Sequence, residues 1–475
     1  MSPASSALRP GSLRPVAMLA VLALTSCALA LVSGMASSLV YTDLEPALRQ
    51  LGFTLQHLRP IHETFAFAWV FLGGAALVHV WLLTTFGPLR RGEVLRFAAQ
   101  VALWSAAGLG ILATFLAGRF SGREYAGYHP AFSVMILLGW LLFAWNFFGR
   151  AGLSLRGRPV YVYMWVTSLP LFVISFAEAH AYLLEAVSRH PLWDLRIQWK
   201  AGGVLVGSFN QMAYGAMMYA ACRMKGDDSY AHSRTAWAMF VVGVLNTFSN
   251  YGHHTYHTPQ TAWIHWTAFL VSMSEIVILA KVGLDVWKLA RGSNPAPDLA
   301  LPLRFGRSVT VWTFAMLALA MVLSVPPLNT FAHGTHVVVA HVMGSMIGID
   351  SMILWAGLAW ALRELAGPAQ PALRSAGLRR AVTAVDVLLA LFLLVFAGRG
   401  LAAGMTVTLG PSAPDWSLLV QWFPATMATL GHALAALCLW IVVRLGVGFV
   451  GTLVGAPAAA VAADSAAGRS ARQSA

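Results

Sequence analysis

Histidines gather in one stretch, Phe331–Ile349, which reads FAHGTHVVVAHVMGSMIGI. It contains His333, His336 and His341, with Met343 two residues further on. The stretch lies in an apolar run, and imidazoles are costly in lipid unless they face a bundle interior or bind something. It therefore predicts a metal- or haem-binding helix whose partners come from elsewhere in the chain.

Other apolar segments carry residues that could be these partners. His62 lies in LRPIHETFAFAW, His253 and His254 in SNYGHHTYH, and Glu275 in FLVSMSEIVIL. A carboxyl group in the middle of a span is expensive, which favours proton handling or a hydrogen-bonded structural role for Glu275. Neighbouring helix residues point about 100° apart, so the histidine pair binds one metal only at a distorted turn. An interfacial polar end is the alternative, for this pair and for His62.

His341 and Met343 are two residues apart, about 200° around a helix. They face opposite sides and could serve two cofactors that flank one helix; for Met343, packing is the alternative. A further group, Glu178, His180 and Glu185 in SFAEAHAYLLE, predicts either an ion or proton site or a solvated helix end.

The composition sets the class of protein. Of 475 residues, 58% are hydrophobic and 10% are charged, against roughly a quarter charged in soluble proteins. Apolar stretches of about 20 residues recur from end to end, which predicts an all-α integral membrane protein. The net charge of +13 arises from arginines and lysines in short connections. That pattern sets membrane topology and does not indicate nucleic-acid binding.

The apolar stretches predict about twelve transmembrane helices. We expect a cytoplasmic N-terminus (1–14), a haem-binding membrane domain (15–455) and a disordered cytoplasmic tail (456–475). The predicted spans are 15–40, 61–85, 94–118, 130–149, 158–186, 198–222, 233–252, 261–287, 307–325, 335–362, 380–402 and 423–451.

Basic residues are concentrated in alternate connections between the spans, which places both termini in the cytoplasm. Representative clusters are Arg90 and Arg91, Arg150, Arg156 and Arg158, and Arg374, Arg379 and Arg380. In this orientation His62, the 253–254 pair and His341 lie at one depth, about a third of the way in from the outer face. That convergence predicts a site.

The three cysteines are Cys27, Cys222 and Cys438, and none belongs to a CxxC or CxxCH motif. This spacing excludes a disulfide framework, a thiolate metal site and a covalently attached c-type haem in this chain.

Taken together, these motifs resemble the catalytic subunit I of the haem–copper oxidase superfamily, in its nitric oxide reductase large-subunit branch. The matching pieces are RPIH at 59–62, GREY at 122–125, YGHH at 251–254, SMSE at 272–275 and VPPLNTFAHGTHVVVAH at 325–341. Their order and the pattern of spans agree over nearly the whole chain. The resemblance implies a twelve-helix bundle of the haem–copper oxidase subunit I type.

The resemblance also implies cofactors and ligands. His341 would be the proximal ligand of a high-spin b-type haem, and His62 a ligand of a low-spin b-type haem. His253 and His254 would bind a non-haem metal, iron in reductases and copper in oxygen reductases. Glu275 matches a buried glutamate of the proton path or metal site. Glu124 of GREY matches a glutamate that helps to hold calcium near the haem propionates.

Two departures mark an atypical member. Met343 stands where the family has a second low-spin haem histidine, so that haem is ligated by His62 and Met343, ligated elsewhere or lost. Gly203 and Gly207 stand where reductases have a third metal histidine and a glutamate; His180 or Glu178 could contribute instead.

We therefore expect a respiratory oxidoreductase of the bacterial inner membrane, surrounded by lipid, that reduces nitric oxide (2 NO + 2 e⁻ + 2 H⁺ → N₂O + H₂O). Because the chain has no CxxCH motif, a separate c-type cytochrome or cupredoxin subunit would supply electrons. The alternatives are a terminal oxygen reductase acting on O₂, a haem-binding sensor or non-catalytic subunit with a degenerate metal site, and an unrelated transporter.

Overall fold

The computed structural model describes residues 10–121, 123, 125–249, 251–256, 261–291 and 296–473. Side chains are not described at 10–12, 253, 254, 286, 289–291, 330 and 455–473. Within the described ranges the secondary structure is helical and contains no strand, which confirms the all-α prediction.

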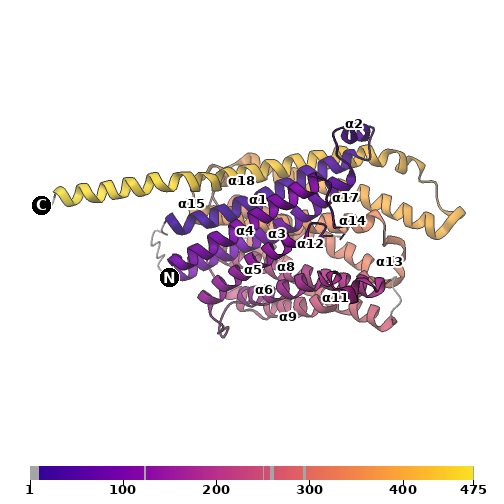
Figure 1. The fold of residues 1–475 in the computed structure, drawn as a ribbon, viewed down its shortest axis with the longest axis horizontal. Helices are drawn as coiled ribbons and strands as arrows, with labels where there is room; N and C mark the ends of the chain where they lie inside the picture. Colours follow the sequence, from indigo (N-terminus) through magenta and orange to yellow (C-terminus); the bar gives the residue numbers. More distant parts are fainter. Residues whose placement is uncertain are drawn as a thin grey trace.

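The helices follow one another along the whole chain (Figure 1). In order they are α1 (Pro10–Leu39), α2 (Glu45–Gln50), α3 (Leu55–Phe86), α4 (Arg91–Leu116), α5 (Pro130–Ala151), α6 (Val160–Glu178), η1 (Ala181–Leu183), α7 (Glu185–Ser188), α8 (Pro191–Lys225), η2 (Ser229–His232), α9 (Arg234–Ser249), α10 (Tyr251–His254), α11 (Ala262–Arg291), α12 (Ala300–Ser324), α13 (Pro326–Ala332), α14 (His336–Met343), η3 (Gly344–Ser351), α15 (Met352–Ala366), α16 (Pro371–Arg374), α17 (Ala376–Leu409), η4 (Gly410–Ser412) and α18 (Ser417–Gln473).

Each of the twelve predicted spans coincides with helix. By length and composition, 10 helices in the part of the chain that the structure describes are long and apolar enough to cross a membrane. The two other predicted spans correspond to α8 and α9. α9 has 16 residues, whereas about 20 are needed to cross a bilayer. The chain is a multi-pass membrane protein.

Most of the helices run along one common direction, and both chain ends lie at the same end of the bundle (Figure 1). α1 packs against α3 and α18, α6 against α8, α11 against α9 and α12, and α14 against α17. The sequence predicts a disordered tail from residue 456, whereas here α18 continues as a helix to Gln473. Its alanine-rich composition has high helix propensity.

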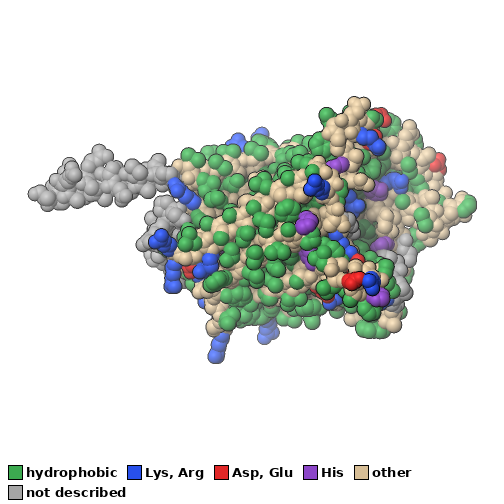
Figure 2. Space-filling view, viewed as in Figure 1, with side chains coloured by type: hydrophobic (Ala, Val, Ile, Leu, Met, Phe, Trp, Pro, Cys, Tyr) green, Lys and Arg blue, Asp and Glu red, His purple; other side chains and the backbone are tan. Residues whose placement is uncertain are grey.

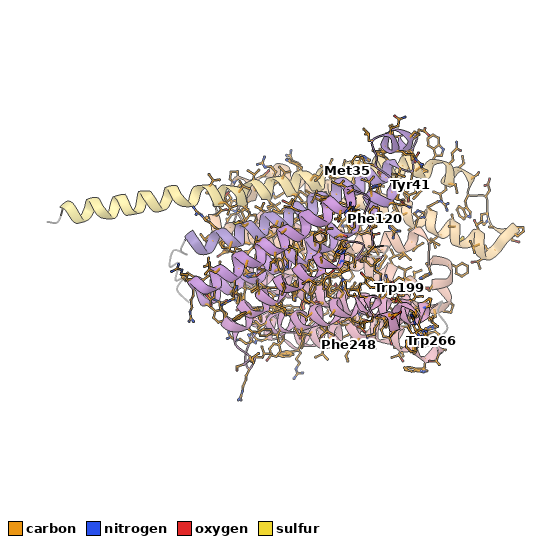
Figure 3. All side chains as sticks on the ribbon, in the orientation of Figure 1. Met35, Tyr41, Phe120, Trp199, Phe248 and Trp266 are labelled. Carbon is orange, nitrogen blue, oxygen red and sulfur yellow. The ribbon has the colours of Figure 1, made fainter. Side chains whose placement is uncertain are left out.

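The outer surface has the character of a membrane protein. On the face in Figure 2, hydrophobic side chains cover the middle of the bundle, and the visible histidines lie in the half away from the termini. Large apolar side chains such as Phe248 and Trp266, labelled in Figure 3, are 56% and 47% exposed. In a bilayer such residues face lipid.

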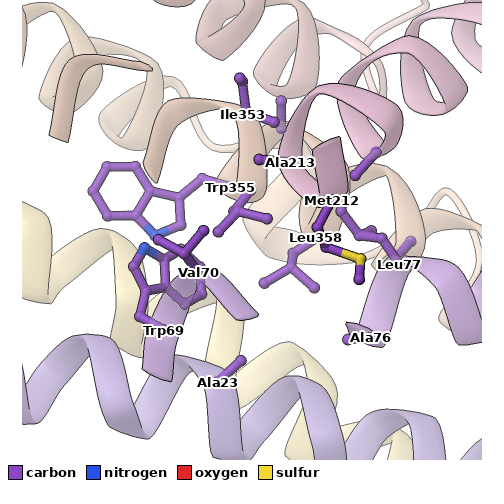
Figure 4. Packing of buried hydrophobic residues seen from close by; sticks show 14 of the residues in the cluster. Ala23, Trp69, Val70, Ala76, Leu77, Met212, Ala213, Ile353, Trp355 and Leu358 are labelled. Atoms are coloured by element: carbon purple, nitrogen blue, oxygen red, sulfur yellow. The ribbon is translucent and has the colours of Figure 1, made fainter. Parts of the chain in front are cut away.

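Inside the bundle, α3, α8 and α15 meet in a dense core (Figure 4). Trp69, Leu77, Met212 and Trp355 are buried there. A Cβ atom at Gly74 would lie 2.3 Å from Met212 Cγ, so the helices approach too closely for a side chain at this position. Small residues at helix contacts are the usual means by which membrane helices pack.

The predicted tenth span is not one regular helix. α14 ends at Met343, the π-helical segment η3 follows, and α15 continues from Met352. The Ser351 hydroxyl holds this π-helical turn, because it donates to the Met346 carbonyl oxygen at 2.7 Å and accepts from Trp69 Nε1 at 2.9 Å. π-helical turns inside helices are frequent at functional sites.

Two glycines bring η3 against α12. Cβ atoms at Gly344 and Gly348 would lie 2.2 Å from Met316 Sδ and 2.4 Å from Trp312 Cγ. The GSMIG sequence at 344–348 thus serves as a small-residue packing surface.

Candidate haem and metal site

A cavity of about 1170 Å³ surrounds the α14–η3 segment. Four of the predicted site residues line it: His62 on α3, Glu275 on α11, and His341 and Met343 on α14. Because His341 and Met343 lie on different sides of α14, the cavity reaches both sides of this helix. Single small-molecule sites typically occupy about 300–1,000 Å³, so this cavity is large enough for a cofactor of the size of haem.

His341 has the environment expected of an iron ligand. Its Nδ1 atom is buried and has no hydrogen-bond partner among the residues that the structure describes. A buried polar atom without a partner is costly and calls for an explanation such as an unrepresented ion or cofactor. The neutral imidazole is also the form that binds metals.

His62 is oriented by the backbone of a neighbouring helix. Its Nδ1–H donates to the Ala30 carbonyl oxygen on α1 at 2.7 Å, which leaves Nε2 available on a ring that lines the cavity. A backbone carbonyl on the second ring nitrogen is the usual support of a metal-binding histidine. The close approach of α1 depends on Gly34, where a Cβ would lie 2.8 Å from His62 Nδ1.

Glu275 has a hydrogen-bond partner and also faces the cavity. Asn246 Nδ2 on α9 donates to its carboxyl group at 2.5 Å, and the Ser272 hydroxyl donates to Asn246 Oδ1 at 3.0 Å. This chain of contacts fixes the direction of the amide and holds the carboxyl group at the cavity wall. This geometry is compatible with both roles that the sequence leaves open for Glu275, proton handling and a hydrogen-bonded structural role.

The predicted second metal and calcium ligands lie outside the described side chains. The backbone of Tyr251–His254 forms α10, but the side chains of His253 and His254 are not described, nor is Glu124. Among the residues that the structure describes, no group of three or more His, Cys, Asp or Glu could hold a metal ion. The non-haem metal and calcium sites therefore stay predictions.

The structure shows why α8 has no side chain at Gly207. A Cβ at Gly207 would lie 2.3 Å from Thr247 Oγ1 on α9, so these two helices touch at this position. Gly203, one turn earlier, is buried and lines the cavity.

The contacts of the SFAEAHAYLLE residues favour a structural role over metal binding. His180 Nδ1 donates to the Phe176 carbonyl oxygen at 2.7 Å, and Nε2 contacts the Ser133 hydroxyl at 2.6 Å. Both ring nitrogens are therefore in use. Glu178 accepts from Lys200 at 2.5 Å, and Glu185 is paired with Arg189.

The other two histidines of the opening stretch differ from each other. His333 lines the cavity. The ring of His336 instead packs against Phe396 and Phe423, with centroids 5.6 and 4.8 Å away. His336 therefore contributes to the packing of α14 against α17 and α18.

Arg123 places a positive charge at the cavity wall. Its Nη1 donates to Asp194 Oδ2 at 2.7 Å, and its guanidinium lies over the Tyr182 ring at 4.5 Å. The hydrogen bond from Arg123 lowers the pKa of Asp194 below its usual value. A guanidinium held in this way suits the carboxylates of haem propionates.

Asp350 and Tyr214 also line the cavity, although neither belongs to the motifs described above. Asp350 is 4% exposed and lies in η3. A carboxyl group within a predicted span is the signal that selected Glu275, and it applies equally to Asp350.

Comparisons with known proteins agree with this geometry. Residues 14–427 match the family described as Cytochrome C and Quinol oxidase polypeptide I. A search of curated proteins gives no match. Among solved structures, a chain from the cryo-EM structure of a heme-copper terminal oxidase dimer has a TM-score of 0.67 and 14% sequence identity. The alignment covers 93% of this chain and 84% of that chain, and at this identity it shows a shared fold.

Proposed function

We propose, because this chain belongs to the Cytochrome C and Quinol oxidase polypeptide I family, that it is the catalytic subunit of a nitric oxide reductase-like enzyme. Membership makes it a membrane-bound oxidoreductase that works with haem and metal cofactors and with electron-donor partners. The finer proposal is the conversion of 2 NO, 2 electrons and 2 protons to N₂O and water.

The observation that carries the proposal is the cavity around α14, which His62, Glu275, His341 and Met343 all line. His341, whose Nδ1 has no partner in the described protein, would hold a high-spin b-type haem. His62 and Met343 would hold a low-spin b-type haem. His253 and His254 would hold the non-haem iron or copper, and Glu124 would contribute to calcium binding. When bound, these groups supply the redox chemistry and the substrate-binding metal.

Groups of the chain itself would orient the haem ligands and place charged and proton-carrying side chains at the cavity wall. The Ala30 carbonyl oxygen fixes the ring of His62. Arg123 would pair with propionate carboxylates at the cavity wall, in the manner of other charge-assisted contacts. Glu275 would hold a proton at its carboxyl oxygens near the reacting atoms, with Asn246 as its fixed neighbour.

We place the protein in the bacterial inner membrane with both termini in the cytoplasm. Both ends lie on one side of the bundle, and the visible histidines lie in the opposite half (Figures 1 and 2). A c-type cytochrome or cupredoxin subunit would then deliver electrons at the outer side, close to the low-spin haem.

The second candidate is a terminal oxygen reductase with copper beside the haem. The family description and the solved structure named above both refer to oxidases, which favours this candidate. Against it, the oxygen reductases' sixth-span motif with a histidine-linked tyrosine is absent here. A haem-binding subunit without catalysis is the third candidate, because Gly203 and Gly207 stand at ligand positions.

Purified protein separates the three candidates. Pyridine haemochrome spectra and metal analysis give the haem type, the haem number and the iron-to-copper ratio. Consumption of NO and of O₂ is then measured with a chemically reduced c-type cytochrome as donor. Two b-type haems, a third iron and NO consumption support the proposal. Copper with O₂ consumption supports the oxidase, and two haems without a second metal overturn catalysis of either kind.

A further inference from the structure

The indole of Trp312 on α12 is anchored to α17 by a carboxylate. Its Nε1–H donates to Asp386 Oδ1 at 3.0 Å. The other carboxylate oxygen, Oδ2, accepts from Arg304 at 2.6 Å and from the Ser308 hydroxyl at 2.8 Å. Because each oxygen has its own donors, the carboxylate has one fixed orientation, and this orientation fixes the indole.

The same indole packs against the π-helical turn η3. A Cβ at Gly348 would lie 2.4 Å from Trp312 Cγ, so the backbone of η3 lies directly on the ring system. From α3, Trp69 Nε1 donates to the Ser351 hydroxyl at 2.9 Å, and this hydroxyl donates to the Met346 carbonyl oxygen at 2.7 Å. Two tryptophans from different helices therefore hold the turn.

The turn determines the direction in which α14 presents its side chains. α15 is fixed in the core, because residues 352–362 are all buried. A π-helical residue turns the chain by less than the about 100° of an α-helical residue, so η3 sets the rotation of α14 relative to α15. His341 and Met343 lie on α14 within one turn of η3. Neither Trp312 nor Asp386 lines the cavity, so their effect on these two side chains passes through η3.

We infer that Trp312 and Asp386 are positioning residues for haem binding. The carboxylate fixes the indole, the indole holds η3, and the turn held in this way directs the two predicted haem ligands of α14. This inference rests on the proposed function, because it takes His341 and Met343 to ligate haem. It gives a task to a carboxylate that lies outside the cavity.

The first test compares two tryptophan variants of the haem-loaded protein. Trp312→Phe keeps a ring against Gly348 and removes the Nε1–H. We expect it to bind haem about 10-fold more weakly, the lower end of the range for groups that support metal ligands, and to change the EPR g-values of the low-spin haem. Haem titration and EPR spectra measure both effects.

Trp165 on α6 gives the matched control. It is buried and does not line the cavity, and its Nε1 donates to the Met212 carbonyl oxygen at 3.3 Å. It also packs against a glycine, since a Cβ at Gly215 would lie 2.7 Å from Trp165 Nε1. Trp165→Phe therefore loses the same volume and the same kind of hydrogen bond. It should lower the unfolding temperature as Trp312→Phe does and leave the haem spectrum unchanged.

Variants of Asp386 separate positioning from simple ion pairing. Asp386→Asn and Asp386→Ala both lose the charge that pairs with Arg304, but the amide oxygen of asparagine can still accept from Trp312 Nε1. We expect Asp386→Asn to retain most of the wild-type haem spectrum and Asp386→Ala to match Trp312→Phe. Equal spectral changes in both Asp386 variants would show that only the ion pair matters and would overturn the inference.

Hydrogen exchange of the peptides that cover 344–351 gives a direct measurement of the turn in the same full-length protein. These amides should exchange faster in Trp312→Phe and Asp386→Ala, and at the wild-type rate in Trp165→Phe. Wild-type exchange together with a wild-type haem spectrum in Trp312→Phe would overturn the inference and leave the proposed function intact. A wild-type protein that binds no haem, with faster exchange in Trp312→Phe, would overturn the proposed function instead.

Discussion

The Nδ1–H of His62 on α3 donates to the carbonyl oxygen of Ala30 on α1 at 2.7 Å. Gly34 lies one turn further along α1, and a Cβ there would meet the same nitrogen at 2.8 Å. We expect Gly34→Ala to push the ring away and to weaken binding of the low-spin haem about 10–100-fold, as for other losses of support to a metal-binding histidine. Haem titration followed by the low-spin absorption bands measures this. Gly149→Ala, where nothing lies within 4 Å, should bind haem normally.

Met343 gives a second test of haem ligation. If His62 and Met343 are the axial ligands, Met343→Ala removes the low-spin spectrum. Met343→His keeps the spectrum low-spin and lowers the midpoint potential, because methionine ligation raises haem potential. Redox titration of the α-band measures the shift. Met346→Ala is the control, since Met346 lines the same cavity and loses the same volume. An unaltered spectrum in Met343→Ala would exclude this ligand assignment.

The sequence predicts the helical class and the twelve helical segments well, because lipid requires long apolar helices and apolar length is visible in the chain. His62, Glu275, His341 and Met343, which the sequence selects as candidate site residues, line one cavity, and their roles stay predictions. Position along a span and orientation in the membrane determine the depth of a residue, which is why the sequence can select such candidates.

Contacts between helices that are distant in the chain could not be predicted from the sequence. The π-helical turn at 344–351 depends on Trp69 and Trp312, which are distant in the chain. The occupied ring of His180 depends in the same way on Ser133. Asp350 is different, because a carboxyl group within a predicted span is a signal that the sequence itself contains.

Gly207 should tolerate no side chain. A Cβ at this position would lie 2.3–2.7 Å from three atoms of Thr247. We expect Gly207→Ala to destabilise the protein by about 1–3 kcal/mol, the usual cost of overpacking. Thermal unfolding in detergent measures it, and Thr247→Ala in the same chain should recover part of the loss. Gly202→Ala on the same helix, with nothing within 4 Å, should leave the unfolding temperature unchanged or higher. Wild-type stability in Gly207→Ala would show that α8 and α9 are not in contact here.

The ion pair between Arg123 and Asp194 should make the free energy of unfolding depend on pH in the acid range. The pKa of Asp194 is lowered by its hydrogen bond from Arg123, so the folded state favours the ionised carboxylate. This contribution is complete above the unfolded pKa of about 3.9 and is lost as the pH falls through the lower folded value. Asp194→Asn should cost about 1.5–3 kcal/mol near neutral pH, the range for hydrogen bonds to charged groups, and should cost progressively less in acid. Unfolding temperatures of Asp194→Asn measured across this pH range test the prediction. Glu185→Gln is the control, because the pair of Glu185 with Arg189 is exposed and its loss shows the effect of removing a surface charge. Parallel pH curves for wild type and Asp194→Asn would contradict the prediction.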